Sequence, residues 1–443
     1  MYLPRRIDSA LLEWKSDKYR KPMLLRGARQ TGKTTAVRNF GATFDTFVEV
    51  NFEKDKSIAK LFDGDLDVKF ICRQIEGATR KRIAPGETLL FFDEIQACPR
   101  AISSLRYFYE DYPELHVVAT GSLLEFVFNE IKDFGVGRIR NTFIYPFSFQ
   151  EFASALGEDI LIEQMREATF DSPVPPLSHE RMLDLLKVFL IVGGMPSAVG
   201  TYAEERNFLD AERMQKDVMT SLKADFGKYS EKVPASRIRS ALTSIVRQTG
   251  GKFKYTDSLA GLTYRQSREA TDLLELSKIV VRSASCHANG IPLGGDLNAK
   301  ANKFMLFDTG LYMNESDFNL SANITLPAVE FINKGWLAEM FVGLELLKAE
   351  DPFTERGLYY WHREVAGSTA EVDYLLQHSE SVLPLEVKSG TTGKMKSLGI
   401  LMKEKNLRLG LRASQENLSA YGNIRVIPLY MIGEWRRLLA ASY

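Results

Sequence analysis

The sequence has few of the residues that mark secreted or metal-stabilised proteins. Its 443 residues include only three cysteines and five histidines. The cysteines are far apart and follow no C-x-x-C pattern, so they predict reduced thiols rather than disulfides. Cys286 and His287 are adjacent, but no further Cys or His lies near them, which argues against a zinc site.

Long apolar runs and a net charge are also missing. No run is long enough to span a bilayer, and the charged segment 1–14 lacks the apolar core of a signal peptide. We therefore expect a soluble, cytoplasmic protein with no membrane partner. Because 57 basic residues balance 57 acidic ones, the total charge does not indicate nucleic-acid binding. Local basic excesses, ten against three in residues 1–40 and seven against two in residues 386–412, fit either a phosphate-rich partner or a solvated surface.

A phosphate-binding loop is present. Residues 27–34 match every fixed position of the pattern G-x-x-x-x-G-K-[ST], between an apolar strand-like run, 22–26, and a helical segment, 35–40. In this context backbone N–H groups hold phosphates, Lys33 reaches the terminal phosphates, and the Thr34 hydroxyl ligates Mg²⁺. The predicted nucleotide-binding residues are Gly27, Ala28, Arg29, Gln30, Thr31, Gly32, Lys33, Thr34 and Thr35.

An acidic pair supplies the second half of this site. The apolar run 88–92 is typical of a strand buried on both faces of a parallel sheet, and it ends in Asp93 and Glu94. Asp93 is predicted to hold Mg²⁺ through water, and Glu94 to polarise the water that attacks the terminal phosphate. An acidic pair after a strand is often only a turn, but its place behind a buried strand favours the hydrolytic interpretation.

Three further side chains are candidates for this site. Residues 116–120 form the next predicted strand, and Thr120 and Ser122 at its end both fit a residue that senses the terminal phosphate or positions water. Of the two we favour Ser122. Arg138 is a candidate arginine finger, acting in cis or across a subunit boundary, although a surface arginine in a loop is the alternative.

The middle of the chain changes to helical patterns. A helix opens with Thr263 and Gln266 at capping-box spacing, and a strand-like run follows at 279–281. This order resembles a winged helix, whose recognition helix would present Arg265, Gln266 and Arg268 to DNA. Protein contact is an equally good reading of the same module.

The C-terminal region contains a second candidate site. Glu386 and Lys388 share one face of a predicted strand, and Asp373 lies on a strand that forms its hairpin partner. The arrangement resembles the PD-(D/E)xK nuclease motif, in which Asp373 and Glu386 bind a divalent cation and Lys388 steadies the attacking water. The glutamate that such folds add on a preceding helix is assigned to Glu339, on the apolar side of its helix, rather than Glu345. An ordinary hairpin with exposed charges, or a fold retained without cleavage, are the alternatives.

Several segments together resemble the prokaryotic AAA-type ATPase family that carries a C-terminal domain of unknown function. They are residues 27–35, 92–96, 119–122, 137–138, 146–152 and 193–196. The resemblance covers nearly the whole chain. It implies an AAA+ core with ATP as the nucleotide, and it makes a ring or another homo-oligomer plausible.

The predicted fold class is α/β: a P-loop NTPase (AAA+) core with a parallel sheet, followed by a helical lid, a winged-helix-like region and a C-terminal restriction-endonuclease-like α/β domain. The predicted boundaries are 1–160, 161–232, 233–300 and 301–443. The leading hypothesis is an Mg²⁺-dependent ATPase that acts on or with DNA or RNA. The alternatives are an ATP-licensed nuclease, and a nucleotide-controlled switch that binds a protein partner.

Overall fold

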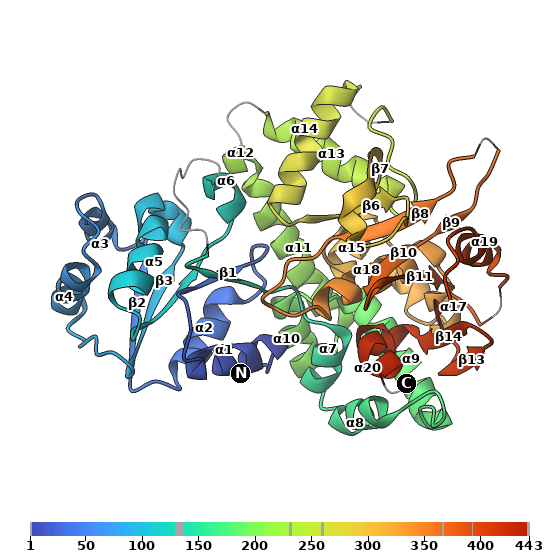
Figure 1. The fold of residues 1–443 in the computed structure, drawn as a ribbon, viewed down its shortest axis with the longest axis horizontal. Coiled ribbons are helices and arrows are strands. Elements are labelled where there is room, and N and C mark those ends of the chain that lie inside the picture. The colour runs from blue at the N-terminus through green and yellow to red at the C-terminus, as the bar shows by residue number, and fades with distance from the viewer. Residues whose placement is uncertain are drawn as a thin grey trace. The chain divides into compact units, whose positions relative to one another are not determined.

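The computed structural model describes two compact units (Figure 1). The described residues are 2–128, 137–229, 233–257, 261–365, 367–391 and 393–440. The predicted lid boundary at residue 232 lies outside them. Unit 1 comprises Met1–Pro146, Leu276–Lys278 and Asp351–Glu355, and unit 2 comprises Phe147–Glu275, Ile279–Glu350 and Arg356–Tyr443. Within the described residues, every helix is too short or too polar to cross a bilayer.

Unit 1 is built on a five-stranded sheet in the order β2-β3-β4-β1-β5. All of its neighbouring strands are parallel. The carboxyl ends of the strands therefore meet at one edge, where parallel α/β sheets bind ligands. The strands are β1 (Met23–Arg26), β2 (Thr46–Asn51), β3 (Thr88–Asp93), β4 (His116–Thr120) and β5 (Arg140–Phe143).

Helices cover both faces of this sheet. Leu89 and Phe91 of β3 pack in one apolar cluster with α1 and α2, whereas Leu90 and Phe92 pack in another with α4 and α5. This alternation confirms the predicted strand buried on both faces, and β1, β4 and α2 agree with the other predicted elements. The helices of unit 1 are α1 (Arg6–Ser16), α2 (Lys33–Gly41), α3 (Lys56–Ala59), α4 (Val68–Thr79), α5 (Pro99–Asp111) and α6 (Leu124–Phe128), with 3₁₀ helices η1 (Lys60–Phe62) and η2 (Ile95–Ala97).

Unit 2 begins with a helical group. It contains α7 (Phe149–Ala155), α8 (Asp159–Glu167), α9 (Pro176–Val192), α10 (Pro196–Glu205), α11 (Phe208–Ala224) and α12 (Phe226–Tyr229). Helix α9 ends where Gly193 adopts a φ of +72°, and a Cβ there would overlap the Asp308 carboxylate. The neighbouring Gly194 N–H donates to Asp308 Oδ2 at 2.6 Å, and the Gly194 carbonyl accepts from Phe147 N–H at 2.7 Å. These contacts explain the predicted helix break at residues 193–196.

Two helices and a hairpin follow. They are α13 (Ala235–Gln248), α14 (Tyr264–Leu276), β6 (Val280–Cys286), the 3₁₀ helix η3 (Leu293–Asp296) and β7 (Leu297–Leu306). Thr263 N–H donates to Gln266 Oε1 at 3.1 Å at the start of α14, so the predicted capping box is present. Strands β6 and β7 are antiparallel, and β6 also pairs in parallel with β8 (Leu358–His362). The hairpin thus belongs to a four-stranded sheet, β7-β6-β8-β9.

The C-terminal part of unit 2 adds a five-stranded sheet in the order β10-β11-β12-β14-β13. The predicted hairpin is confirmed, because β10 and β11 pair in an antiparallel register. The strands are β9 (Glu371–Val372), β10 (Tyr374–His378), β11 (Ser381–Val387), β12 (Gly410–Ser414), β13 (Ser419–Tyr421) and β14 (Ile424–Pro428). The helices are α15 (Thr309–Glu315), α16 (Leu320–Asn323), α17 (Ala328–Ile332), α18 (Gly335–Lys348), α19 (Lys396–Glu404), η4 (Leu429–Glu434) and α20 (Trp435–Ala440).

The first and last helical segments of unit 2 are in direct contact. His179 of α9 lies 2.7 Å from the Tyr430 hydroxyl of η4, and Gln150 Nε2 of α7 donates to Glu434 at 2.8 Å. The ring of Phe149 packs against that of Tyr430 at a centroid distance of 6.2 Å. One core therefore joins segments from both ends of this unit.

Candidate functional site

The phosphate-binding loop lies between β1 and α2, as predicted. Gly32 precedes the helix with a φ of +89°, a conformation that favours glycine. A Cβ on Gly27 would collide with the Ile144 carbonyl oxygen, so the backbone approach there also requires glycine. Thr31 is buried and donates from Oγ1 to the Ala28 carbonyl at 2.9 Å, which closes the turn. The loop leads into the N-terminus of α2, where unpaired N–H groups favour an anion.

Lys33 is the first residue of α2, and its ammonium lies inside the loop. Nζ donates to the carbonyl oxygens of Gly27 at 3.0 Å and Ala28 at 2.7 Å. Burial lowers the pKa of Lys33 to about 8, against the opposing effect of the Glu94 carboxylate. The two carbonyl groups carry no net charge. A bound phosphate would supply negative charge and raise the pKa of Lys33 toward its ordinary value.

Asp93, at the end of β3, accepts hydrogen bonds from three elements. The hydroxyls of Thr34 and Thr120 donate to Oδ1 at 3.0 and 2.6 Å, and Asn51 Nδ2 donates to Oδ2 at 3.1 Å. The sheet order explains this convergence, since β4 lies between β1 and β3, and β2 flanks β3 on its other side. Sequence reasoning missed Asn51, although a polar residue at the end of β2, directly opposite Asp93, was a usable signal.

Glu94 is held by different partners. Its backbone has a φ of +49°, and Oε2 accepts from Gln96 Nε2 at 2.6 Å and from the Ser122 hydroxyl at 3.2 Å. Ser122 Oγ in turn accepts from Arg29 Nε at 3.2 Å. The two sensor candidates are thus divided: Thr120 contacts Asp93, and Ser122 contacts Glu94. Gln96 was not assigned a role from the sequence.

The oxygen atoms at this edge suit Mg²⁺. Mg²⁺ prefers oxygen ligands, keeps several waters, and is held in such sites by one or two carboxylates together with substrate phosphates. The Thr34 hydroxyl and the Asp93 carboxylate, 3.0 Å apart, supply such donors at the N-terminus of α2. Across the described ranges no group of three or more His, Cys, Asp or Glu side chains is arranged to hold a metal ion. The composition of the site therefore fits an ion that arrives with a nucleotide.

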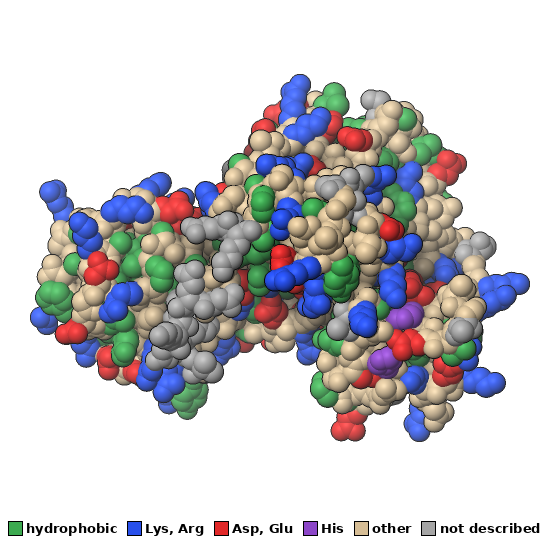
Figure 2. Space-filling view, turned by 90° about the horizontal axis from the view of Figure 1, so that it is seen from above, with side chains coloured by type: hydrophobic (Ala, Val, Ile, Leu, Met, Phe, Trp, Pro, Cys, Tyr) green, Lys and Arg blue, Asp and Glu red, His purple; other side chains and the backbone are tan. Residues whose placement is uncertain are grey.

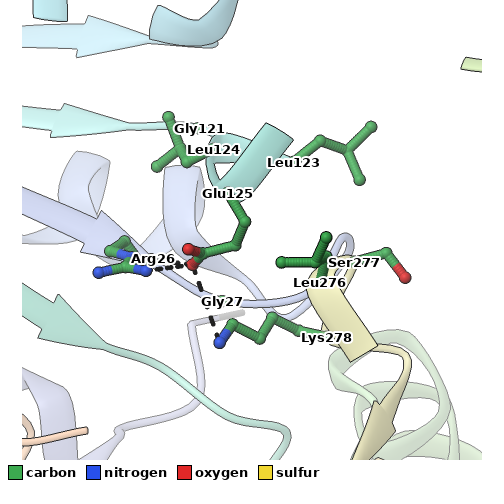
Figure 3. A pocket seen from close by; sticks show the side chains of 9 residues that line it. All are labelled: Arg26, Gly27, Gly121, Leu123, Leu124, Glu125, Leu276, Ser277 and Lys278. Atoms are coloured by element: carbon green, nitrogen blue, oxygen red, sulfur yellow. Dashed lines mark hydrogen bonds and ion pairs between the residues drawn. The ribbon is translucent and has the colours of Figure 1, made fainter. Parts of the chain in front are cut away.

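A pocket of about 220 Å³ lies beside the loop in unit 1 (Figure 3). Arg26 Nε donates to Glu125 at 3.1 Å, and Lys278 Nζ lies 3.8 Å from Glu125 and 2.6 Å from Glu355. This ion-pair network fixes Arg26, the residue before Gly27, at the start of the loop.

Arg138 lies away from the loop. It precedes β5, which is parallel to β1, so it is placed at the amino edge of the sheet, opposite the edge that carries the loop. There it forms an ion pair with Glu110 in the last turn of α5. This position argues against an arginine finger in cis, and the role of Arg138, in cis or across a subunit boundary, stays a prediction.

Comparison with protein families agrees with this geometry. The family model for an AAA domain matches residues 19–153, the segment that contains the loop and both acidic residues. This segment is an AAA-type P-loop domain. Beyond the AAA domain, two domains of unknown function match, DUF8612 at residues 183–321 and DUF4143 at residues 334–432. Curated proteins provide no sequence match to the chain.

Three solved structures are similar to parts of the chain. The Walker-type ATPase PABY2304 of Pyrococcus abyssi is 14% identical, with a TM-score of 0.46, over 71% of this chain and 96% of that protein. The Aeropyrum pernix ORC1 protein in complex with DNA is 16% identical, with a TM-score of 0.26, over 72% and 92%. Cdc6p from Pyrobaculum aerophilum is 15% identical, with a TM-score of 0.25, over 62% and 82%. The assignment of the AAA domain rests on the family match and the geometry of the loop.

The four C-terminal candidates come from neighbouring elements of unit 2. Asp373 lies between β9 and β10 and accepts from Val387 N–H at 2.7 Å, and Lys388 Nζ donates to Glu386 Oε1 at 2.6 Å. Burial raises the pKa of Glu386, and the negative charge of Asp373 raises it further. Burial and the same Asp373 charge raise the pKa of Glu339 to about 7, against the effect of Lys303. Lys303 contacts both Glu339 and Glu371, and Asp373 accepts from the backbone next to Glu386, so the carboxylates lie on neighbouring elements.

Glu345 is also buried but faces another part of unit 2. It accepts from Phe149 N–H at 3.1 Å and pairs with Lys348 at 3.1 Å. Both glutamates are buried, but only Glu339 contacts Lys303, so Glu345 lies outside this group of carboxylates. The carboxylate cluster formed by Glu339, Glu371, Asp373 and Glu386 includes one member, Glu371, that sequence reasoning missed, together with the buried cation Lys303.

Proposed function

We propose that this protein binds ATP with Mg²⁺ at the loop between β1 and α2 and hydrolyses it. The observation that carries the proposal is the division of labour between the two acidic residues. Asp93 is oriented by Thr34 and Thr120, while Glu94 beside it is bound by two other residues, Gln96 and Ser122. A metal-binding carboxylate next to a separate carboxylate that can act as the base supports hydrolysis of a phosphoanhydride.

Each side chain then has a defined task. The loop N–H groups and Lys33 would bind the phosphates, and Thr34 and Asp93 would hold Mg²⁺, which when bound would supply positive charge to the phosphate oxygens. Glu94 accepts a proton from the attacking water through its carboxylate. The water oxygen forms a bond to the γ-phosphorus as the bond from that phosphorus to the bridging oxygen breaks, and ADP leaves with the bridging electrons. Ser122 positions Glu94 through its hydroxyl.

Substitution of Glu94 tests this proposal. Glu94→Gln keeps the shape of the side chain but cannot accept the proton, so ATP binding persists while turnover falls by about two to four orders of magnitude. Lys33→Ala is the matched control, because it removes phosphate binding itself. Nucleotide affinity measured with a fluorescent ATP analogue and phosphate release from ATP separate the two effects. Unchanged turnover in Glu94→Gln would remove Glu94 from the role of base.

We also propose nucleic acid as the partner of unit 2. The support is α14, where the side chains of Arg265 and Arg268 are 88% and 52% exposed, and which the β6–β7 hairpin follows in the chain. Both arginines also lie near acidic residues of their own helix, Glu269 and Asp272, at 2.9 and 3.9 Å. Gln266 is engaged in the capping box, so direct base contact is assigned to the two arginines alone.

Because surface charges of both signs are mixed, the nucleic-acid partner is tested by measuring its effect on ATP turnover. On the face shown in Figure 2, Lys and Arg side chains are interspersed with Asp and Glu. ATP turnover is therefore measured with single-stranded DNA, double-stranded DNA and RNA, which are afterwards inspected for cuts. The double substitution Arg265→Ala and Arg268→Ala should abolish the stimulation of ATP turnover by nucleic acid. Substitution of an exposed arginine of α11, Arg213→Ala, should leave that stimulation unchanged. If no nucleic acid changes ATP turnover and a protein partner is captured in only one nucleotide state, the alternative of a nucleotide-controlled switch that binds a protein would be favoured.

A further inference from the structure

A buried lysine lies inside the carboxylate cluster of unit 2. Lys303 on β7 is only 2% exposed, and its Nζ is 2.8 Å from Glu339 Oε1 and 2.5 Å from Glu371 Oε1. The Tyr360 ring lies beneath the same ammonium, with its centroid 5.0 Å away. Two carboxylates and an aromatic face therefore enclose one positive charge.

The same carboxylates are those expected to hold a divalent cation in a nuclease-like fold. Glu339 is bonded directly to Lys303, and Asp373 is close enough to act on the Lys303 charge. Glu386 has one oxygen bonded to Lys388, while within the described part of the chain its other oxygen is buried without a hydrogen-bond partner. Lys303 and Lys388 thus supply positive charge directly to three carboxylates of the cluster, those of Glu339, Glu371 and Glu386.

A divalent cation does not fit beside this ammonium. Mg²⁺ and Ca²⁺ need direct contact with carboxylate oxygens, at roughly 2.0–2.6 Å. Lys303 Nζ already lies 2.8 Å from Glu339 Oε1. A metal ion bound to the same oxygen would be adjacent to the Lys303 ammonium, and the two positive charges would repel each other. Lys303 could reach solvent only by breaking its buried ion pair with Glu339 and its ion pair with the partly exposed Glu371, and loss of the buried pair is strongly unfavourable.

We propose that Lys303 is an internal cation that takes the place of the divalent metal ion in this cluster, so that unit 2 keeps the carboxylates without binding metal there. This inference goes beyond ATP hydrolysis and is independent of it. It assigns the cluster a structural role and removes the metal on which phosphodiester cleavage by such a motif depends. Contact with nucleic acid, if it occurs, leaves the strand intact.

A Mn²⁺ titration of the full chain without nucleotide gives the first test. Wild type and Asp373→Asn should bind the same number of ions, because the cluster contributes none. One additional Mn²⁺ per chain in wild type, lost in Asp373→Asn, would overturn the proposal. This comparison needs no substitution of Lys303 and holds whether or not such a variant folds.

The second test removes the internal cation. Lys303→Met should lower the midpoint of thermal unfolding, bind one additional Mn²⁺ per chain, and regain part of its midpoint when Mn²⁺ is added. Lys348→Met is the matched control, because the Lys348 side chain is only 5% exposed and pairs with Glu345 on the same helix, α18, outside the cluster. Lys348→Met should also lower the midpoint of thermal unfolding, but added Mn²⁺ should not raise that midpoint again. Equal responses of the two variants to Mn²⁺ would show that Lys303 does not occupy the position of a cation.

Discussion

The hydrogen bond between Gln96 and Glu94 offers a test of how hydrolysis is restrained. Gln96 Nε2 donates to the Glu94 carboxylate at 2.6 Å, and the Gln96 Oε1 atom is buried with no partner among the described residues. A hydrogen bond to a charged group contributes about 1.5–3 kcal/mol, whereas a buried polar atom without a partner costs about 1–3 kcal/mol. In Gln96→Leu these two contributions oppose each other, so we expect little change in the free energy of unfolding.

The effect on turnover should be much larger. If Glu94 must leave Gln96 before it accepts a proton, removing about 1.5–3 kcal/mol from that step raises the rate about ten- to a hundredfold. Steady-state phosphate release at saturating ATP and Mg²⁺ measures this change, and denaturant unfolding confirms unchanged stability. Glu94→Gln combined with Gln96→Leu should remain inactive. A stable Gln96→Leu protein whose turnover is unchanged or lower would refute the reasoning and make Gln96 part of the productive site.

Three further predictions concern stability. Burial lowers the pKa of Lys33 to about 8, so between about pH 8 and 10 the unfolded chain binds more protons than the folded one. The free energy of unfolding of the nucleotide-free protein should therefore rise over this pH range. The rise should be smaller in Lys33→Met. Thr120→Val removes a buried donor to Asp93 and should cost about 1–3 kcal/mol in denaturant unfolding, whereas Thr142→Val, at a buried hydroxyl with no partner among the described residues, should cost less. Gly194→Ala would press a Cβ against the Phe147 carbonyl and lower the thermal midpoint, while Gly200→Ala in α10, with open space around it, should stabilise by about 1 kcal/mol; equal effects of the two would contradict the packing described for Gly194.

The nucleotide site was largely predictable because its determinants are local. The pattern at 27–34 fixes the loop, and the apolar run before Asp93 identifies β3. Asn51 and Gln96 were missed for different reasons. The contact of Asn51 depends on which strands are neighbours, and the contact of Gln96 depends on a turn in which Glu94 has a positive φ.

The carboxylate cluster was only partly predictable. Asp373, Glu386 and Lys388 belong to one hairpin, so strand alternation places them together. Lys303 lies 36 residues before its partner Glu339 and on a different sheet from that hairpin. A lysine in a polar stretch of sequence normally indicates an exposed position, and its burial follows only from the carboxylates that surround it.

The contact between the two ends of unit 2 bears on how the chain is made. Helices α7 and α9 are translated early, together with their aromatic side chains. Tyr430 and Glu434, which contact them in the folded unit, are translated near the end of the chain. Nascent chains would thus lack the Tyr430 contact of Phe149 until translation is nearly finished, although Phe189 and Phe341 already pack against that ring. A gene fragment that stops before η4 should yield an insoluble product, and so should one that starts after α9.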